Sequence, residues 1–310
     1  MPLFGVLPID KRAGISSRVV VNRIERLVRS ERVGHTGTLD PMATGVLLMA
    51  IGSATKLVEF SHELAKGYEA TFELGKSSDT LDATGEVKEA DIAVQPSAEA
   101  IQTELSKWQG RVQQVPPNFS ALVIDGRRAY KMARKGVEFD LAPREVEINR
   151  LELVDYQFPF FKLNIECGSG TYVRAIGRDI AQGLGTHAIM TALTRTRVGP
   201  FTLDDCVDAR GLYNRYEVQQ HLHPPQRLVH NWYTVTLNEE QTIDLRNGQT
   251  LRLNEQIGRH RFVVVDSAQN LVGLMEATQE AGVFRSLRVF HADNAANQPK
   301  KIKTKQSPES

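Results

Sequence analysis

The sequence is short of the features that mark several classes of protein. It holds two cysteines in 310 residues, too few for a disulfide framework, which fits a reducing cytosol. No stretch reaches the roughly 18 consecutive apolar residues that a membrane-spanning helix needs. The N-terminus MPLFGVLPIDKR lacks a charged n-region, and Pro8 and Asp10 interrupt its apolar run, so we expect no signal peptide. These absences predict a cytoplasmic protein without a membrane segment.

Net charge gives no sign of a nucleic-acid-binding protein, because the formal charge at pH 7 is only +1. Local charge is more informative, because basic side chains gather in two short segments. They are Arg18, Arg23, Arg26, Arg29 and Arg32 in the first, and Arg127, Arg128, Lys131, Arg134 and Lys135 in the second. Each run taken alone is typical of a solvated helix face. A neutral protein with basic faces can still bind a polyanion locally, so both interpretations stay open.

Several common catalytic motifs are also missing. The Gly/Thr-rich loop GHTGTLDP at 34–41 is not followed by the Gly-Lys-Ser/Thr of a P-loop, and there is no G-x-S-x-G of a serine hydrolase. A strand, a Gly168-Ser-Gly170 turn and a helix suggest a nucleotide-cofactor enzyme, but Val173 stands where the dinucleotide fingerprint needs glycine. The histidines cluster only in a Pro-rich segment without cysteine or nearby acids, so we expect no metal site. That cluster is His221, His223 and His230.

Hydrophobic periodicity predicts a mixture of helices and strands. Buried or alternating runs predict strands at 4–11, 67–75 and 160–170, and apolar stripes predict helices at 16–30, from Ser97 to Trp108, and at 171–185. The segment 127–136 reads as a short basic helix ended by glycine. Beyond residue 230, short strand-like runs predict a small β-barrel or sandwich of about 60 residues.

Three polar residues have both a structural and a chemical interpretation. Asp40, followed by Pro41 and an apolar run, is typical of a helix N-cap with proline at the first helical position. Tyr68 shares a strand face with Phe72 and is a core tyrosine by default, although its hydroxyl can reach a cleft. Arg174 lies in the first turn of a predicted helix, where backbone N–H groups favour an anion, or it points to solvent.

The order of the short motifs is more specific than any one of them. Along the chain come Lys11-Arg-Ala-Gly-Ile-Ser16, Gly34-His-Thr-Gly-Thr-Leu-Asp40-Pro, Lys66-Gly-Tyr68-Glu, Leu74-Gly75 with Asp79-Thr80 and Asp82, Gly170-Thr-Tyr172-Val-Arg174, and Leu193-Thr-Arg-Thr. This series closely resembles the TruB family of tRNA pseudouridine synthases, from about residue 3 to 210 and more loosely to 290. The resemblance implies an isomerase that converts uridine-55 in the T loop of tRNA to pseudouridine, without metal or cofactor.

The resemblance also implies the architecture and the partners. The fold class is α+β, with a mixed, largely antiparallel sheet and flanking helices over residues 1–228. A small β-barrel PUA-like RNA-binding domain is expected over 229–292, and a basic disordered tail over 293–310. The expected partner is the T-arm stem-loop of tRNA. Neither a membrane nor an obligate protein partner is implied, and the family is generally monomeric.

By the same resemblance, Asp40 is the essential catalytic carboxylate, and the atom that it engages (C1′, C2′ or a base atom) stays open. Arg174 is expected to pair with it and hold it ionised. Tyr68 is expected to stack on the uracil and to take or relay the C5 proton. Tyr172 and Leu193 are expected to line the base pocket.

The remaining expected contacts concern the RNA. The target uridine must be flipped out of the folded T loop, and His35 is expected to contact the displaced nucleotides. Lys56 and the two basic segments are expected to hold the RNA backbone, while Gly34 and Gly37 leave room for it. Lys11 and Gly170 are the remaining loop residues of the motif series, and their implied role is structural.

Three positions depart from the family pattern. Arg12 stands where the family usually has proline, Val123 where it has lysine, and Thr194 where it has the first of two arginines. None of them is one of the expected catalytic residues, so the departures concern packing and the grip on RNA. The alternative function from another class is a non-catalytic tRNA-binding or tRNA-folding module that uses the same cleft.

Overall fold

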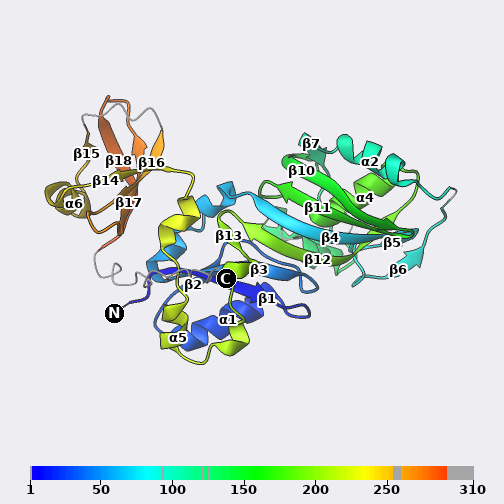
Figure 1. The fold of residues 1–310 in the computed structure, drawn as a ribbon, viewed down its shortest axis with the longest axis horizontal. Coiled ribbons are helices and arrows are strands. Elements are labelled where there is room, and N and C mark those ends of the chain that lie inside the picture. Colours follow the sequence, from blue (N-terminus) through cyan, green and yellow to red (C-terminus); the bar gives the residue numbers. More distant parts are fainter. Residues whose placement is uncertain are drawn as a thin grey trace, which may run out of the picture.

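The protein is described from a computed structural model that defines residues 2–92, 94–120, 122–124, 126–137, 139–253 and 260–291. The predicted tail at 293–310 lies outside these residues. Figure 1 shows a large sheet with its helices, and a smaller C-terminal sheet at one end of the molecule. The α+β class predicted from the sequence is confirmed.

The large sheet has nine strands, seven of them in the order β1-β3-β12-β4-β11-β10-β7. Their bounds are β1 Gly5–Lys11, β3 Thr44–Ile51, β4 Lys66–Leu74, β7 Gly110–Gln114, β10 Arg144–Gln157, β11 Phe160–Cys167 and β12 Ala188–Val198. Two short strands complete it: β2 (Val33–His35) pairs with β3, and β13 (Phe201–Thr202) pairs with β12. All pairs are antiparallel except the short parallel contact between β12 and β3. The strands that carry Tyr68 and Leu193 are therefore neighbours in the middle of the sheet.

The helices of the large sheet share one hydrophobic core on one face. The N-cap of helix α1 (Ser17–Val28) is Ser16, whose hydroxyl accepts from the backbone N–H of Val19. Helix α4 (Val173–Gly183) packs on β12, and α2 (Ala98–Ser106) packs on β10 and α4. The other helices are α3 (Ala129–Ala133) and α5 (Arg215–Gln220), with 3-10 turns at Gly52–Leu57, Phe60–Glu63, Leu203–Asp205, Ala209–Gly211 and Pro225–Val229. Two small hairpins pair β5 (Lys76–Ser78) with β6 (Val87–Glu89) and β8 (Val123–Ile124) with β9 (Arg127–Arg128).

Strands β1 and β3 are buried on both faces. Leu47 and Met49 of β3 point into the core with α1, whereas Val46 and Leu48 point into a second core on the opposite face. That second core includes C-terminal residues, namely Val263, Val265, Leu271, Leu274 and Phe290. The C-terminal sheet therefore shares a continuous apolar core with the face of β1 and β3 that lies away from α1, and 3-10 turns of the chain lie between the two sheets (Figure 1).

The predicted C-terminal β unit is present as a five-stranded sheet in the order β14-β16-β17-β18-β15. Its strands are β14 Tyr233–Thr236, β15 Leu251–Arg252, β16 Arg261–Val265, β17 Leu271–Ala277 and β18 Val283–Val289. A core of its own includes Phe262 and Phe284, whose rings meet edge to face with centroids 4.8 Å apart. Helix α6 (Glu239–Arg246) was not expected from the sequence. The domain boundary at 228/229 stays a prediction.

The interpretation of Asp40 as a helix N-cap is wrong. The chain makes a turn, closed by a 3.1 Å hydrogen bond from the Ala43 N–H to the Asp40 carbonyl, and then enters strand β3. The apolar run after Pro41 lacks alternation because both of its faces are buried, and such a run does not distinguish a strand from a helix.

Candidate active site

A pocket of about 370 Å³ opens where the loop 36–40, strands β4 and β12 and the start of α4 meet. Seven of the residues singled out in the sequence line it: Gly37, Asp40, Tyr68, Gly170, Tyr172, Arg174 and Leu193. Lys66, Ser169 and Arg195, which were given no role, line it too. Four segments far apart in the sequence thus meet at one cavity of the size that binds small ligands.

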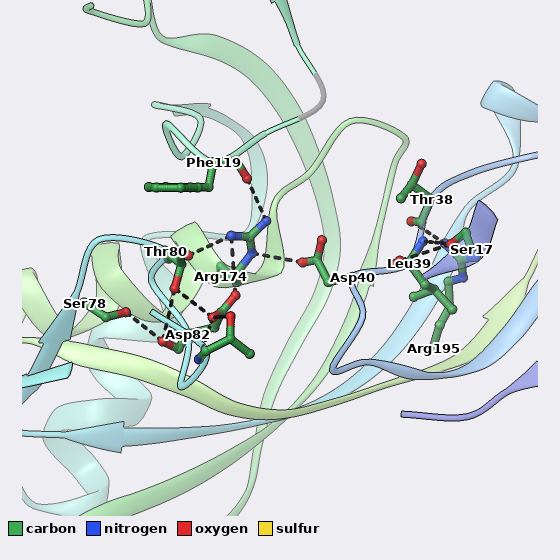
Figure 2. Close-up of polar contacts among 11 residues, drawn as sticks. Ser17, Thr38, Leu39, Asp40, Ser78, Thr80, Asp82, Phe119, Arg174 and Arg195 are labelled. Carbon is green, nitrogen blue, oxygen red and sulfur yellow. Dashed lines mark hydrogen bonds and ion pairs between the residues drawn. The ribbon is translucent and has the colours of Figure 1, made fainter. Parts of the chain in front are cut away.

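The centre of the pocket is an ion pair between Arg174 and Asp40. Nε of Arg174 lies 3.0 Å from Oδ2 of Asp40, and the arginine is only 7% exposed. Figure 2 shows the guanidinium held from the other sides as well, by the carbonyls of Thr80 at 2.7 Å and Phe119 at 3.1 Å. Because its direction is fixed by these contacts, Arg174 does not point to solvent but holds the Asp40 carboxylate in place.

Asp82 is a second carboxylate on the same guanidinium, 3.5 Å from Nη1 of Arg174. It is 4% exposed, and its Oδ1 accepts from the Thr80 hydroxyl at 2.8 Å and from the Thr84 N–H at 2.9 Å. Figure 2 shows Arg174 between the two acids, of which Asp40 is the one that lines the pocket. Asp82 was given no role from the sequence, although its place in the motif series was the signal that could have found it.

The loop that carries Asp40 is fastened through its backbone on both sides of that residue. The Ser17 hydroxyl accepts from the Leu39 N–H at 2.9 Å and donates to the Leu39 carbonyl at 3.1 Å. The Lys11 ammonium donates to the Pro41 carbonyl at 3.2 Å. Arg195 donates to the carbonyl of Gly37 at 3.1 Å. The Asp40 side chain itself stays 34% exposed and faces the pocket.

Tyr68 belongs to both the core and the pocket. Strand β4 alternates as predicted, so Tyr68 shares the buried face with Ala70 and Phe72. Burial raises the pKa of the Tyr68 phenol, with the Arg195 guanidinium opposing the shift, so the phenol is neutral at physiological pH. Tyr68 is therefore a core residue, as expected by default, and it also lines the pocket.

Three buried cations surround the base of the loop. Burial lowers the pKa of Lys66 to about 8, and the nearby Arg195 guanidinium adds to the effect. Burial also lowers the pKa of Lys11 to about 8, although Asp40 partly opposes that shift. Arg195 is 1% exposed and also donates to the Val46 carbonyl at 2.7 Å. Lys66 and Arg195 were missed as site residues, although each lies inside a motif of the series.

Other predicted residues lie outside the pocket lining. His35 lies in β2, where burial lowers the pKa of its imidazole. The Lys56 ammonium lies 6.0 Å from the ring centroid of Phe290, close to the C-terminal sheet. A side chain at Gly34 would meet only a methyl group of Thr55, at 3.7 Å. Arg23, one of the residues of the first basic segment, instead donates to the backbone carbonyls of residues 209, 210 and 212.

Of the three residues that depart from the family pattern, two have a polar side-chain partner and one is exposed. Arg12 pairs with Asp208 at 2.9 Å, and the Thr194 hydroxyl lies 2.8 Å from that of Thr44. Val123 is exposed in β8. Within the described ranges, no group of three or more His, Cys, Asp or Glu side chains is arranged to hold a metal ion. None of the described helices is long and apolar enough to cross a membrane.

The sequence of this chain matches those of a known protein family. A profile described as "TruB family pseudouridylate synthase (N terminal domain)" matches residues 25–173. The tRNA pseudouridine synthase B of Dehalococcoides mccartyi is 34% identical over 289 residues, which cover 92% of this chain and 96% of that relative. The chain belongs to the TruB family. The resemblance drawn from the motif series is confirmed, and TruB membership makes the chain an isomerase of the pseudouridine synthase class.

Further matches agree with TruB membership. The tRNA pseudouridine synthase B of Rhodococcus jostii is 45% identical over 205 residues, covering 64% of this chain and 67% of that relative. The solved structure described as "Crystal Structure of a Cbf5-Nop10-Gar1 Complex" contains a chain that superposes with a TM-score of 0.71 at 21% identity. That superposition covers 94% of this chain and 86% of the other. At this identity the likeness is one of fold, and it supports the predicted pseudouridine synthase architecture.

Proposed function

We propose that this protein isomerises uridine-55 in the T loop of tRNA to pseudouridine, with Asp40 as the essential carboxylate. The observation that carries the proposal is the Asp40–Arg174 ion pair, 3.0 Å long, in a pocket that also holds Tyr68. The relatives named tRNA pseudouridine synthase B support the substrate. A purely RNA-binding module has no use for a buried arginine that orients a carboxylate, so the geometry favours the enzyme.

The reaction breaks the bond between C1′ and N1, rotates the uracil and joins C5 to C1′. The proton on C5 is then lost and N1 gains one, so atoms and charge balance without a cofactor. A carboxylate serves as nucleophile at C1′ or the base, or as a base at C2′. Arg174 aims the Asp40 carboxylate, which lies 3.0 Å from its Nε. Asp82 shares the same guanidinium, so that Asp40 is held less tightly and stays reactive.

The walls of the pocket suit a flat neutral base. Tyr68 offers an aromatic face and a neutral phenol that can relay the C5 proton. Leu193 supplies an apolar contact, and the ring of Tyr172 is fixed by the Arg144 guanidinium 4.6 Å from its centroid. We assign these residues to uracil binding, because a flipped base is recognised by stacking and apolar contact together with polar edges.

Contacts outside the pocket complete the proposal. His35 contacts displaced nucleotides, while Lys56 and the exposed basic side chains of α1 hold the RNA backbone, which makes binding salt-sensitive. The C-terminal sheet serves as a PUA-like RNA-binding domain. The protein acts as a monomer in the cytoplasm without an obligate protein partner.

The direct test uses T-arm RNA that carries tritium at C5 of uracil. The wild type should release tritium to water, and Asp40→Asn should release none while binding the RNA with similar affinity in a filter-binding assay. Asp79→Asn is the matched control, because Asp79 is a nearby carboxylate that, among the described residues, accepts only from the backbone N–H groups of Thr80 and Glu86. Absence of tritium release by the wild type would refute the proposed function.

A further inference from the structure

The base of the pocket carries more positive than negative charge. Lys66 and Arg195 line it and are 7% and 1% exposed, yet neither forms an ion pair with an acidic side chain among the described residues. Asp40, which lines the pocket, and the buried Asp82 behind it both pair with Arg174 instead. Buried charges in proteins are as a rule paired, so this part of the pocket has room for an anion that the chain itself does not supply.

Lys66 is the cation placed to meet that anion. It precedes Tyr68 by two residues on β4, so both side chains point to the same face of the sheet. Its ammonium donates to the Leu64 carbonyl at 3.1 Å and to the Ser169 hydroxyl at 3.2 Å. An ammonium has three N–H donors, and the third has no acceptor among the residues that the structure describes.

Ser169 supplies a second donor beside the first. Its hydroxyl oxygen accepts from Lys66, so its own proton is left to donate. The residue is exposed and lines the same pocket, in the loop that leads into α4. By contrast, the guanidinium of Arg195 donates to the carbonyls of residues 37, 38 and 46. Arg195 therefore contributes positive charge to the pocket without contacting the anion directly.

We infer that Lys66 and Ser169 form a phosphate subsite, which binds a phosphodiester adjacent to the uridine that lies over Asp40. This inference rests on the proposed function, because the anion is taken to be the backbone of the RNA substrate. A flipped nucleotide brings its own phosphates to the pocket, and each carries one full negative charge. A lysine binds such a group as a point charge, and a hydroxyl adds direction.

The experiment combines a protein change with a matching change in the RNA. T-arm substrates carry a neutral methylphosphonate in place of the phosphate either 5′ or 3′ of the target uridine. Lys66→Met should lower kcat/KM on the all-phosphate RNA by about 10- to 100-fold, the size expected for a hydrogen bond to a charged group. At one of the two positions, methylphosphonate should lower the kcat/KM of the wild type by a similar factor. It should leave the kcat/KM of Lys66→Met almost unchanged, because that variant has already lost the contact with the phosphate.

Three further variants separate the subsite from a structural lysine. Lys66→Arg keeps the charge and should restore part of the discrimination against methylphosphonate. Ser169→Ala should weaken the same discrimination without affecting folding, because its side chain is exposed. Lys88→Met removes an exposed lysine of β6, with 68% of its side chain accessible, and should respond like the wild type to both neutral phosphates.

The outcomes distinguish the two levels of the proposal. If the two changes lower kcat/KM by independent factors that multiply at both RNA positions, Lys66 contacts neither phosphate of the target uridine. The subsite is then refuted, while the proposed function stands. If Lys66→Met does not fold, as judged by thermal unfolding, the same multiplication test on Ser169→Ala decides. If the wild type releases no tritium from all-phosphate RNA, the proposed function fails and the subsite falls with it.

Discussion

Asp82 offers the sharpest test of how the pocket tunes its reactive carboxylate. Asp82→Asn keeps the shape of the side chain and removes its charge. The amide oxygen can still accept from Thr84, whose N–H lies 2.9 Å from Oδ1. The amide nitrogen then faces Nη1 of Arg174, where Oδ2 now lies at 3.5 Å, so a donor meets a donor. Arg174 is left with a single carboxylate, Asp40, and binds it more tightly.

The size of the effect follows from this geometry. At 3.5 Å and an effective dielectric constant near 20, Coulomb's law gives a gross attraction of about 5 kcal/mol. Hydrogen bonds to charged groups retain about 1.5–3 kcal/mol of such a gross attraction. If Asp40 is held too tightly by that amount, it becomes a weaker nucleophile or base, and kcat falls by about 10- to 100-fold, since about 1.4 kcal/mol is tenfold. The free energy of unfolding should fall by about 2 kcal/mol, since Arg174 keeps another partner.

The assay is single-turnover tritium release with enzyme in excess over T-arm RNA, together with RNA affinity by filter binding and stability by urea unfolding. The expected signature is a slower reaction with an affinity within about twofold of the wild type, because an interaction realised in the chemical step acts on kcat. Asp79→Asn again serves as the control for changes in the same loop. An unchanged single-turnover rate in an Asp82→Asn variant that has lost stability would show that Asp82 only supports the loop, and the tuning argument would be wrong.

Three further predictions follow from the same region. Gly170→Ala should lower the free energy of unfolding by about 1–2 kcal/mol in urea titrations, because Gly170 has a φ of +88°. Arg195→Lys should lower the melting temperature and slow tritium release by about tenfold, because an ammonium cannot replace a guanidinium fork that serves three carbonyls. Burial lowers the pKa of Lys66 to about 8 from its ordinary value of 10.5. The charged form of Lys66 therefore disfavours folding below pH 8, and this penalty disappears as the pH rises from about 8 to 10.5. Lys66→Met should therefore be most favourable for stability, relative to the wild type, at pH 7, and its advantage should shrink by about 1.4 kcal/mol per pH unit between pH 8 and about 10.5.

The elements that the sequence predicted well are those with a strong local period. The strand at 67–75 alternates, and the helix at 16–30 begins at a serine cap, so neighbouring residues alone determine each of them. Two long strands of the large sheet, β10 and β12, were not predicted. Both contain irregularities in pairing, between Ile148 and Arg150 and between Arg195 and Arg197 for example, and each shift interrupts the alternation.

Asp40, Tyr68 and Arg174 were predicted as site residues from the family resemblance, and they line one pocket, but the rest of that pocket was only partly predicted. What a linear pattern does not give is the direction of a short polar side chain in a loop. Asp82 faces inward because its loop pairs with β12, through a hydrogen bond from the Ala83 N–H to the Met190 carbonyl at 3.0 Å. Lys66 faces the pocket because β4 lies in the centre of the sheet. Both causes are contacts between segments that lie far apart in the chain.

In the proposed reaction, the position of Asp40 in a turn, and not at a helix N-terminus, leaves its carboxylate free to act. As an N-cap, its carboxylate would accept from backbone N–H groups at a helix start and would be occupied there. In the structure the loop is fastened through its backbone by Ser17, Lys11 and Arg195 instead. The one ion pair of Asp40 in the described part of the chain is to Nε of Arg174 through Oδ2. Because a carboxylate offers about four acceptor positions on its two oxygens, and the loop needs none of them, Oδ1 is left for the substrate.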